Sequence, residues 1–162
     1  MNLVRYSCLL ALGAAACLAQ TVPATITKTS GMVGIAQGET ARLNLLNPGV
    51  AISPASGATT SASANCSAAV AFFDGAGNNL KSTTVSVPPG QSVGFDLHSD
   101  TDLGLAAGDR KEIRAVVTLP AVPGATSTSA LAPACKLVKT LEIFDSLTMR
   151  TLVVLSRFAV VP

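Results

Sequence analysis

The sequence predicts an all-β protein, an antiparallel β-sandwich of about seven strands. Short apolar segments alternate with Gly- and Pro-rich turns along the chain. Within several segments, polar and apolar residues alternate with the period of two that is typical of a half-buried strand. No stretch after residue 19 keeps a helical period, and the 162 residues are enough for one core.

The N-terminus has the three parts of a secretory signal peptide, which we place at residues 1–19. Arg5 supplies the positive charge, an apolar run extends from Cys8 to Ala16, and Cys17 and Ala19 provide the small side chains before the cleavage site. The apolar run is shorter than the roughly 20 residues that a membrane-spanning helix needs. We therefore expect cleavage before Gln20 and no transmembrane segment in the mature chain.

Export would place the mature chain in the periplasm, at the cell surface or outside a bacterial cell. The residues Ala15-Ala16-Cys17 are similar to the end of a bacterial lipoprotein signal, but Ala14 stands where that signal carries Leu, so we expect no lipid anchor at Cys17. Two cysteines remain after cleavage. In an oxidising compartment we expect a disulfide between Cys66 and Cys135, with two separate buried thiols as the alternative.

The mature chain divides into an extended N-terminal segment, residues 20–31, and a β-sandwich domain, residues 32–162. Two low-complexity loops, Pro54–Asn65 and Pro120–Pro133, interrupt the domain. A dense turn signal, Asp74–Asn78, joins two strands into a predicted hairpin. The expected strands are Thr40–Asn47, Cys66–Phe73, Leu80–Val87, Val93–Leu97, Ile113–Val117, Leu137–Phe144 and Thr151–Leu155.

The turn pattern resembles that of secreted bacterial immunoglobulin-like sandwich modules. In those modules an aromatic-Asp-x-x-Gly turn is followed by a strand, a Pro-Gly-Gln break and a further strand, as in Phe73–Gly77 and Thr84–Ser92 here. Gly38-Glu39-Thr40, before a strand that ends in Asn47, looks like the start of such a module. The likeness covers about half of the mature chain. It implies an immunoglobulin-like fold, without the core Trp of antibody domains, and an adhesive, accessory or structural role.

The composition argues against a nucleic-acid partner. Lysines and arginines exceed the acids by only two, and they form no basic stripe. Aromatic side chains that could stack on bases or sugar rings are scarce, since the chain has no Trp and its one Tyr lies in the predicted signal peptide.

One stretch carries candidate metal ligands, because Asp96, His98, Asp100 and Asp102 occupy every second position. A loop in this region could gather oxygen ligands around Ca²⁺, which takes six to eight of them. However, the glycine of an EF-hand turn and a closing Glu are both missing. We therefore expect a solvated loop in which the carboxylates cap turns, and no bound metal or cofactor.

The inventory of side chains also argues against catalysis. His98 is the only histidine, so any Ser-His-Asp or Cys-His arrangement would have to use it. The chain's three glutamates, Glu39, Glu112 and Glu142, fall at or within strands, where exposed charges are ordinary. We expect a non-enzymatic exported protein that acts through protein contacts or as a structural or adhesive module. The alternatives are a small-ligand or Ca²⁺-binding module that uses the loop from Asp96 to Asp102, and a fibre subunit assembled by strand addition.

Overall fold

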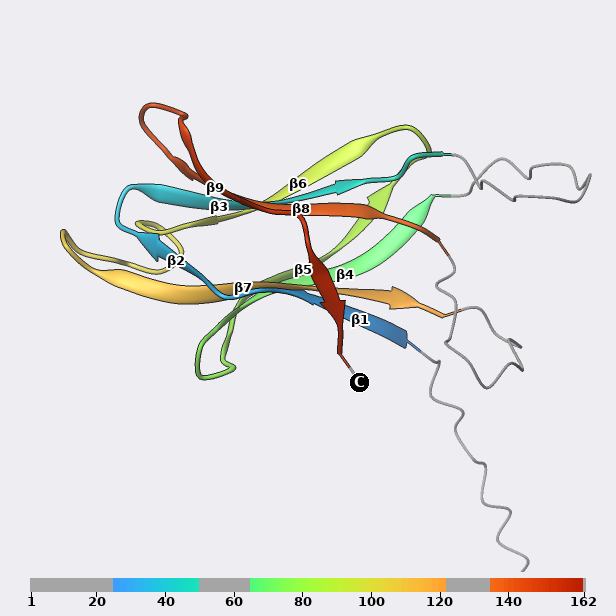
Figure 1. Cartoon of the computed structure of the whole chain (residues 1–162), viewed down its shortest axis with the longest axis horizontal. Helices are drawn as coiled ribbons and strands as arrows, with labels where there is room; N and C mark the ends of the chain where they lie inside the picture. The colour runs from blue at the N-terminus through green and yellow to red at the C-terminus, as the bar shows by residue number, and fades with distance from the viewer. Residues whose placement is uncertain (1–24, 50–64, 122–134, 162) are drawn as a thin grey trace, which may run out of the picture.

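A computed structural model describes residues 25–49, 65–121 and 135–161. These residues form two antiparallel sheets and no helix, so the predicted all-β class is confirmed (Figure 1). The predicted signal peptide, its cleavage site and Cys17 lie outside the described residues. So does nearly all of the two low-complexity loops.

The two sheets pack face to face (Figure 1). The first has the order β10-β1-β7-β4-β5, with β2 also paired to β7, and the second has the order β6-β3-β8-β9. The strands of the first sheet are β1 (Thr25–Ser30), β2 (Val33–Ala36), β4 (Cys66–Asp74), β5 (Asn79–Val87), β7 (Arg110–Pro120) and β10 (Phe158–Val160). Those of the second are β3 (Glu39–Leu46), β6 (Ser92–His98), β8 (Val138–Asp145) and β9 (Thr151–Leu155).

The described part of the chain has ten strands, whereas the sequence predicted about seven. The three additional strands are β1, β2 and β10, and all of them belong to the first sheet. Residues 25–30, expected to be an extended lead-in, pair with β7 from Thr25 opposite Pro120 to Thr29 opposite Val116. The β-branched threonines of this segment favour a strand, so the sheet begins before residue 32.

Alternating side chains fill the space between the sheets. In β3, Ala41, Leu43 and Leu45 are fully buried, as the period of two predicted. Ile113, Val117 and Leu119 of β7 face them from the other sheet. Phe72 of β4 stacks on Phe95 of β6 with ring centroids 5.4 Å apart, and so joins the two sheets at the centre of the core.

The predicted hairpin between β4 and β5 is present, and Asp74 shapes its turn. One carboxylate oxygen of Asp74 accepts hydrogen bonds from the backbone N–H groups of Ala76 and Asn78, at 3.0 and 2.8 Å. The side-chain amide of Asn78 donates to the other oxygen. These hydrogen bonds, those from Asn78 above all, lower the pKa of Asp74. Gly77 takes the positive φ that the turn requires.

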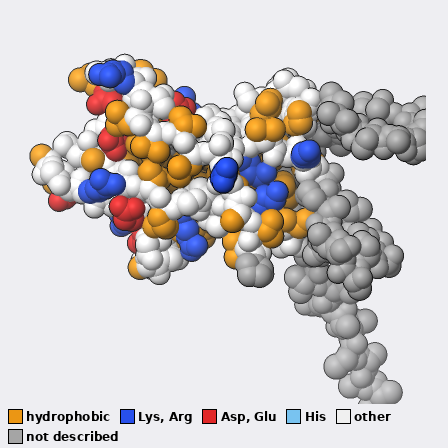
Figure 2. All heavy atoms as spheres, in the orientation of Figure 1, with side chains coloured by type: hydrophobic (Ala, Val, Ile, Leu, Met, Phe, Trp, Pro, Cys, Tyr) orange, Lys and Arg blue, Asp and Glu red, His pale blue; other side chains and the backbone are white. Residues whose placement is uncertain are grey.

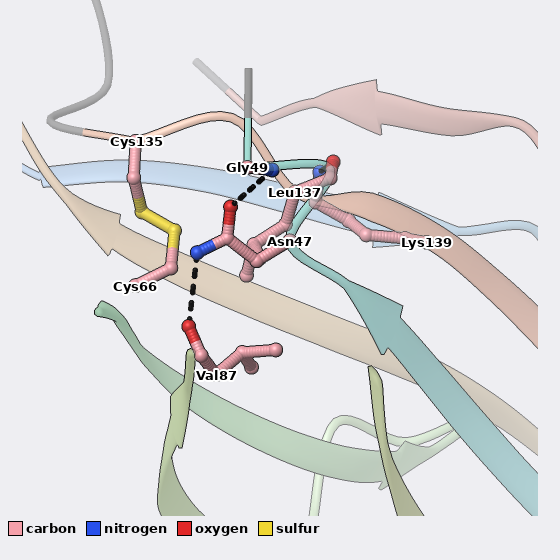
Figure 3. Close-up of a disulfide and its surroundings, with 7 residues drawn as sticks. All are labelled: Asn47, Gly49, Cys66, Val87, Cys135, Leu137 and Lys139. Carbon is pink, nitrogen blue, oxygen red and sulfur yellow. Dashed lines mark hydrogen bonds between the residues drawn. A yellow bond between two sulfur atoms is a disulfide. The ribbon is translucent and has the colours of Figure 1, made fainter. Parts of the chain in front are cut away.

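Cys66 and Cys135 form the predicted disulfide, with their Cα atoms 5.8 Å apart (Figure 3). Cys66 begins β4 of the first sheet, and Cys135 precedes β8 of the second. The bond therefore ties the two sheets together at one end of the sandwich.

The side chain of Asn47 lies beside the disulfide and is buried. Its amide donates a hydrogen bond to the carbonyl of Val87 at 2.9 Å, and its oxygen accepts one from Gly49 (Figure 3). Its backbone exchanges hydrogen bonds with Gly90 and Gln91. Asn47 thus fastens the end of β3 to the turn between β5 and β6.

Candidate functional site

The acidic stretch lies at the end of β6 and in the turn that follows. Asp96 and His98 point to the outer face of the second sheet, because Leu97 between them is fully buried. Asp100 and Asp102 lie beyond the end of the strand.

Asp96 forms a two-pronged ion pair across the sheet with Arg42 of β3. The Nε and Nη2 atoms of Arg42 each lie 2.7 Å from a different carboxylate oxygen. The hydrogen bond to Asp96 is the main reason why the pKa of Arg42 is raised. The guanidinium also lies 5.1 Å from the centre of the Phe144 ring on β8. Asp96 is therefore one member of a polar row across the outer face.

His98 and Asp102 make local contacts as well. The Nδ1 atom of His98 lies 3.0 Å from the hydroxyl of Thr40. One oxygen of Asp102 accepts hydrogen bonds from the ammonium of Lys81 at 2.7 Å and from the backbone N–H of His98 at 2.8 Å. Burial raises the pKa of Asp102, but the bonds from Lys81 and His98 outweigh this effect and lower it.

Asp100 holds the neighbouring turn. Its carboxylate accepts hydrogen bonds from the backbone N–H of Gly38 at 2.8 Å and from the hydroxyl of Ser99 at 3.0 Å. The four side chains proposed as ligands thus hold separate partners on β3, β5 and the adjoining turns. Within the described residues, no three His, Cys, Asp or Glu side chains come together in a group that could hold a metal ion.

A second feature, which sequence reasoning did not single out, is the hairpin of β8 and β9. Among the described strands, β9 pairs only with β8, so it forms one edge of the second sheet. Leu152, Val153 and Val154 of β9 are exposed, Val154 by 57%. The turn before β9 adds Leu147, which is 91% exposed, and Met149. We call these five residues the β9 patch.

The turn of this hairpin is well ordered by hydrogen bonds. One oxygen of Asp145 accepts hydrogen bonds from the backbone N–H groups of Leu147 and Thr148 and from the hydroxyl of Thr148. The bonds from Thr148 are the main cause of the lowered pKa of Asp145. Met149 has a φ of 58°, which is uncommon for a residue with a side chain. These hydrogen bonds define the backbone of the turn from which Leu147 and Met149 extend into solvent.

Figure 2 shows hydrophobic side chains exposed on the side of the molecule where β9 and β10 lie in Figure 1. Within the β9 patch, Val153 lies opposite the buried Ile143 and Val154 opposite Glu142, so the exposed apolar side chains occupy both faces of the strand. Exposed apolar area gathered on one element is a mark of interaction sites. The β9 patch is therefore the strongest candidate for a contact surface in the described part of the chain.

No family model, curated protein or solved structure matches the chain. In the described part of the chain, no helix is long and apolar enough to cross a membrane.

Proposed function

We propose that the protein is an exported, non-enzymatic, immunoglobulin-like module that binds another protein by accepting one of its strands at β9. The observation that carries this proposal is the unprotected edge of the second sheet. Export is supported by the signal-like N-terminus and by the Cys66–Cys135 disulfide, which suits an oxidising compartment.

Edge strands usually carry charges that prevent pairing with other chains. In this protein β5 carries Lys81, β6 carries Asp96, and the uncharged strands β10 and β2 are only three and four residues long. Strand β9 has the sequence Thr-Leu-Val-Val-Leu, without charge, proline or glycine. Its edge offers unpaired main-chain groups, and the β9 patch offers apolar area beside them.

The charges around β9 indicate what kind of strand would bind there. Arg150 and Arg157 flank the strand in sequence, Asp145 interacts with Arg150, and Glu142 lies on β8 opposite Val154, where it accepts a hydrogen bond from the hydroxyl of Thr151. Parallel, in-register pairing of β9 with β9 of a second copy would place the two Arg150 residues side by side, and antiparallel pairing would place Arg150 near residues 156 and 157 of the copy, where the chain leaves the sheet. A partner strand with acidic residues at its ends would instead meet complementary charge. We therefore favour a different protein as the partner over a fibre of β9–β9 contacts.

A designed peptide provides a direct test. The probe is a Thr/Val-rich strand peptide with Glu at both ends, compared with a peptide of the same core with Lys at both ends. We expect the Glu-ended peptide to bind more tightly and to slow hydrogen exchange at the amides of β9. The double variant Leu152→Glu/Val154→Glu should weaken this binding at least about tenfold, since it removes apolar area and adds repulsive charge.

The matched control is Met32→Glu/Leu46→Glu, which adds the same charge at exposed apolar positions outside the β9 patch. It should bind the peptide like the wild type. Equal binding of both peptides, or protection of amides elsewhere than β9, would contradict the proposal. A different outcome is self-association of the wild type that depends on concentration and that the β9 variant abolishes. That result would show that the partner of β9 is a second copy of this chain and not a different protein.

A further inference from the structure

A cavity of about 210 Å³ opens between the two sheets, beside the segment that connects β9 to β10. It exists because β9 accompanies β8 only from Leu141 onward, opposite Leu155. After Leu155 the chain leaves the second sheet and crosses to the first, where β10 pairs with β1. The start of β8 is therefore not covered by β9. The residues that line the cavity are Lys28, Leu137, Val138, Lys139, Ser156 and Phe158.

Two lysines face this cavity from opposite sheets. Lys28 of β1 is paired with Val117 and lies on the same face of its sheet as that core residue. Lys139 of β8 is paired with Leu45, which is also in the core. Side chains of directly paired residues point to the same side of a sheet, so both lysines point inward. Lys139 is only 8% exposed.

The ammonium of Lys139 has no carboxylate partner among the described residues. It donates one hydrogen bond, to the carbonyl of Leu137 at 2.6 Å (Figure 3 shows both residues). All nine Asp and Glu residues of the chain lie in the described part. Among those described residues, no carboxylate forms an ion pair with Lys28 or Lys139. An Asp or Glu side chain of the same chain therefore does not neutralise this site.

Two ammonium groups at this cavity destabilise the folded state unless a negative charge neutralises them. Burial, and to a smaller extent the charge of Lys28, lowers the pKa of Lys139 to about 8. At neutral pH the ammonium is therefore still protonated, inside the protein and next to a second positive charge. Buried charges in proteins are ordinarily paired with an opposite charge, and a bound anion would supply one here.

We propose that this cavity binds a small organic carboxylate, held between the ammonium groups of Lys28 and Lys139. The hydroxyl of Ser156 is a further donor at the rim of the cavity. Most of the exposed lining is polar, and Leu137 and Phe158 contribute apolar surface against which the short hydrocarbon chain of a carboxylate would rest. The competing explanation is that the two lysines only prevent the nearby sheet edges from pairing with other chains.

The test measures Tm in butyrate, phosphate and chloride at equal ionic strength. We expect butyrate to raise the Tm of the wild type by about 5 °C near saturation, and to shift the NMR signals of Leu137 and Phe158. Lys139→Met and Lys28→Met should each abolish both effects. Lys139→Met removes a buried charge, so it is expected to fold. Lys136→Met, at an exposed position outside the cavity lining, is the matched control and should respond like the wild type.

A Tm increase that persists in Lys139→Met would mean general salt stabilisation and would overturn the proposal. A response to phosphate alone, lost in Lys139→Met, would overturn the assignment of a carboxylate. Self-association of Lys139→Met, with no effect of any anion on the wild type, would show that the lysines only protect the edge.

Discussion

Asn47 shows how a single buried polar side chain joins two parts of the sandwich. Replacing it with Ala would leave the carbonyl of Val87 and the backbone N–H of Gly49 without their side-chain partner. We expect Asn47→Ala to lower the free energy of unfolding by about 1–3 kcal/mol, the cost of leaving buried hydrogen-bonding groups unsatisfied. Urea denaturation measures the loss.

Asn44→Ala is the control for this prediction. Asn44 lies on the outer face of β3, and its side-chain contact with Glu142 within the described part of the chain is a long one, at 3.5 Å. Its removal should change the stability by less than about 0.5 kcal/mol. Equal losses of stability in the two variants would show that the side-chain hydrogen bonds of Asn47 make no special contribution to the free energy of unfolding.

Lys139 leads to a second prediction at the residue scale, this time on pH. The folded state loses its Lys139 proton near pH 8, whereas the unfolded chain keeps it to about 10.5. Between these values the unfolded state binds more protons, so the free energy of unfolding of the wild type rises with pH. Lys139→Met should be more stable at pH 7 by about 1–3 kcal/mol. This advantage should shrink as the pH rises from 8 to 10.5.

The measurement is urea denaturation of both proteins across that pH range, in a buffer without carboxylate or phosphate. Subtracting the two stabilities removes the titration of the other lysines. Lys136→Met changes the same charge at an exposed site and should show a constant difference from the wild type. A constant difference for Lys139→Met as well would show that its ammonium is not desolvated in the folded state.

Residue identities alone could not reveal the hydrogen-bond partners of Asn47 or of the acidic stretch from Asp96 to Asp102. The sequence identified Asn47 correctly as the end of a strand, but its partner Val87 is 40 residues away. In the same way, the spacing of Asp96, His98, Asp100 and Asp102 made them candidate ligands within what we expected to be a solvated loop. Their actual partners, Arg42, Thr40, Gly38 and Lys81, lie on other strands and turns. Local spacing carries no information about pairing over such distances.

At the scale of elements, the sequence predicted best the strands that are buried on one face. The strands β3, β6 and β7 follow the period of two, because every second side chain enters the core. Strands β1 and β10 were missed for different reasons. β1 is rich in Thr, with Lys28 pointing inward, and so lacks a clean apolar face, whereas β10 is too short to show a period.

Strand β9 was predicted as a strand, but its position at the edge was not. Its uniform apolar composition resembles that of a central strand, which is buried on both faces. Only the sheet order shows that β8 is its sole neighbour within the described residues. The contradiction between a core-like sequence and an exposed position is what makes this element the proposed contact surface.

At the scale of the whole molecule, the disulfide could be predicted because only two cysteines remain outside the predicted signal peptide. The sheet order could not, because several pairings of ten short strands satisfy the same alternation. The cavity between Lys28 and Lys139 depends on that order, since it arises where β9 leaves β8 and β10 joins β1. The sequence therefore gave no sign of it.

The disulfide is expected to stabilise the sandwich by joining its two sheets. The cysteines are 69 positions apart, so the bond restricts a large part of the unfolded chain. Replacing both in Cys66→Ala/Cys135→Ala should lower the free energy of unfolding by about 2–4 kcal/mol, measured by urea denaturation. Adding a thiol reductant should lower the stability of the wild type by a similar amount and leave the double variant unchanged. Two free thiols in the exported, non-reduced protein would contradict the bond, and a reductant effect of equal size on both proteins would show that the stability loss has another cause.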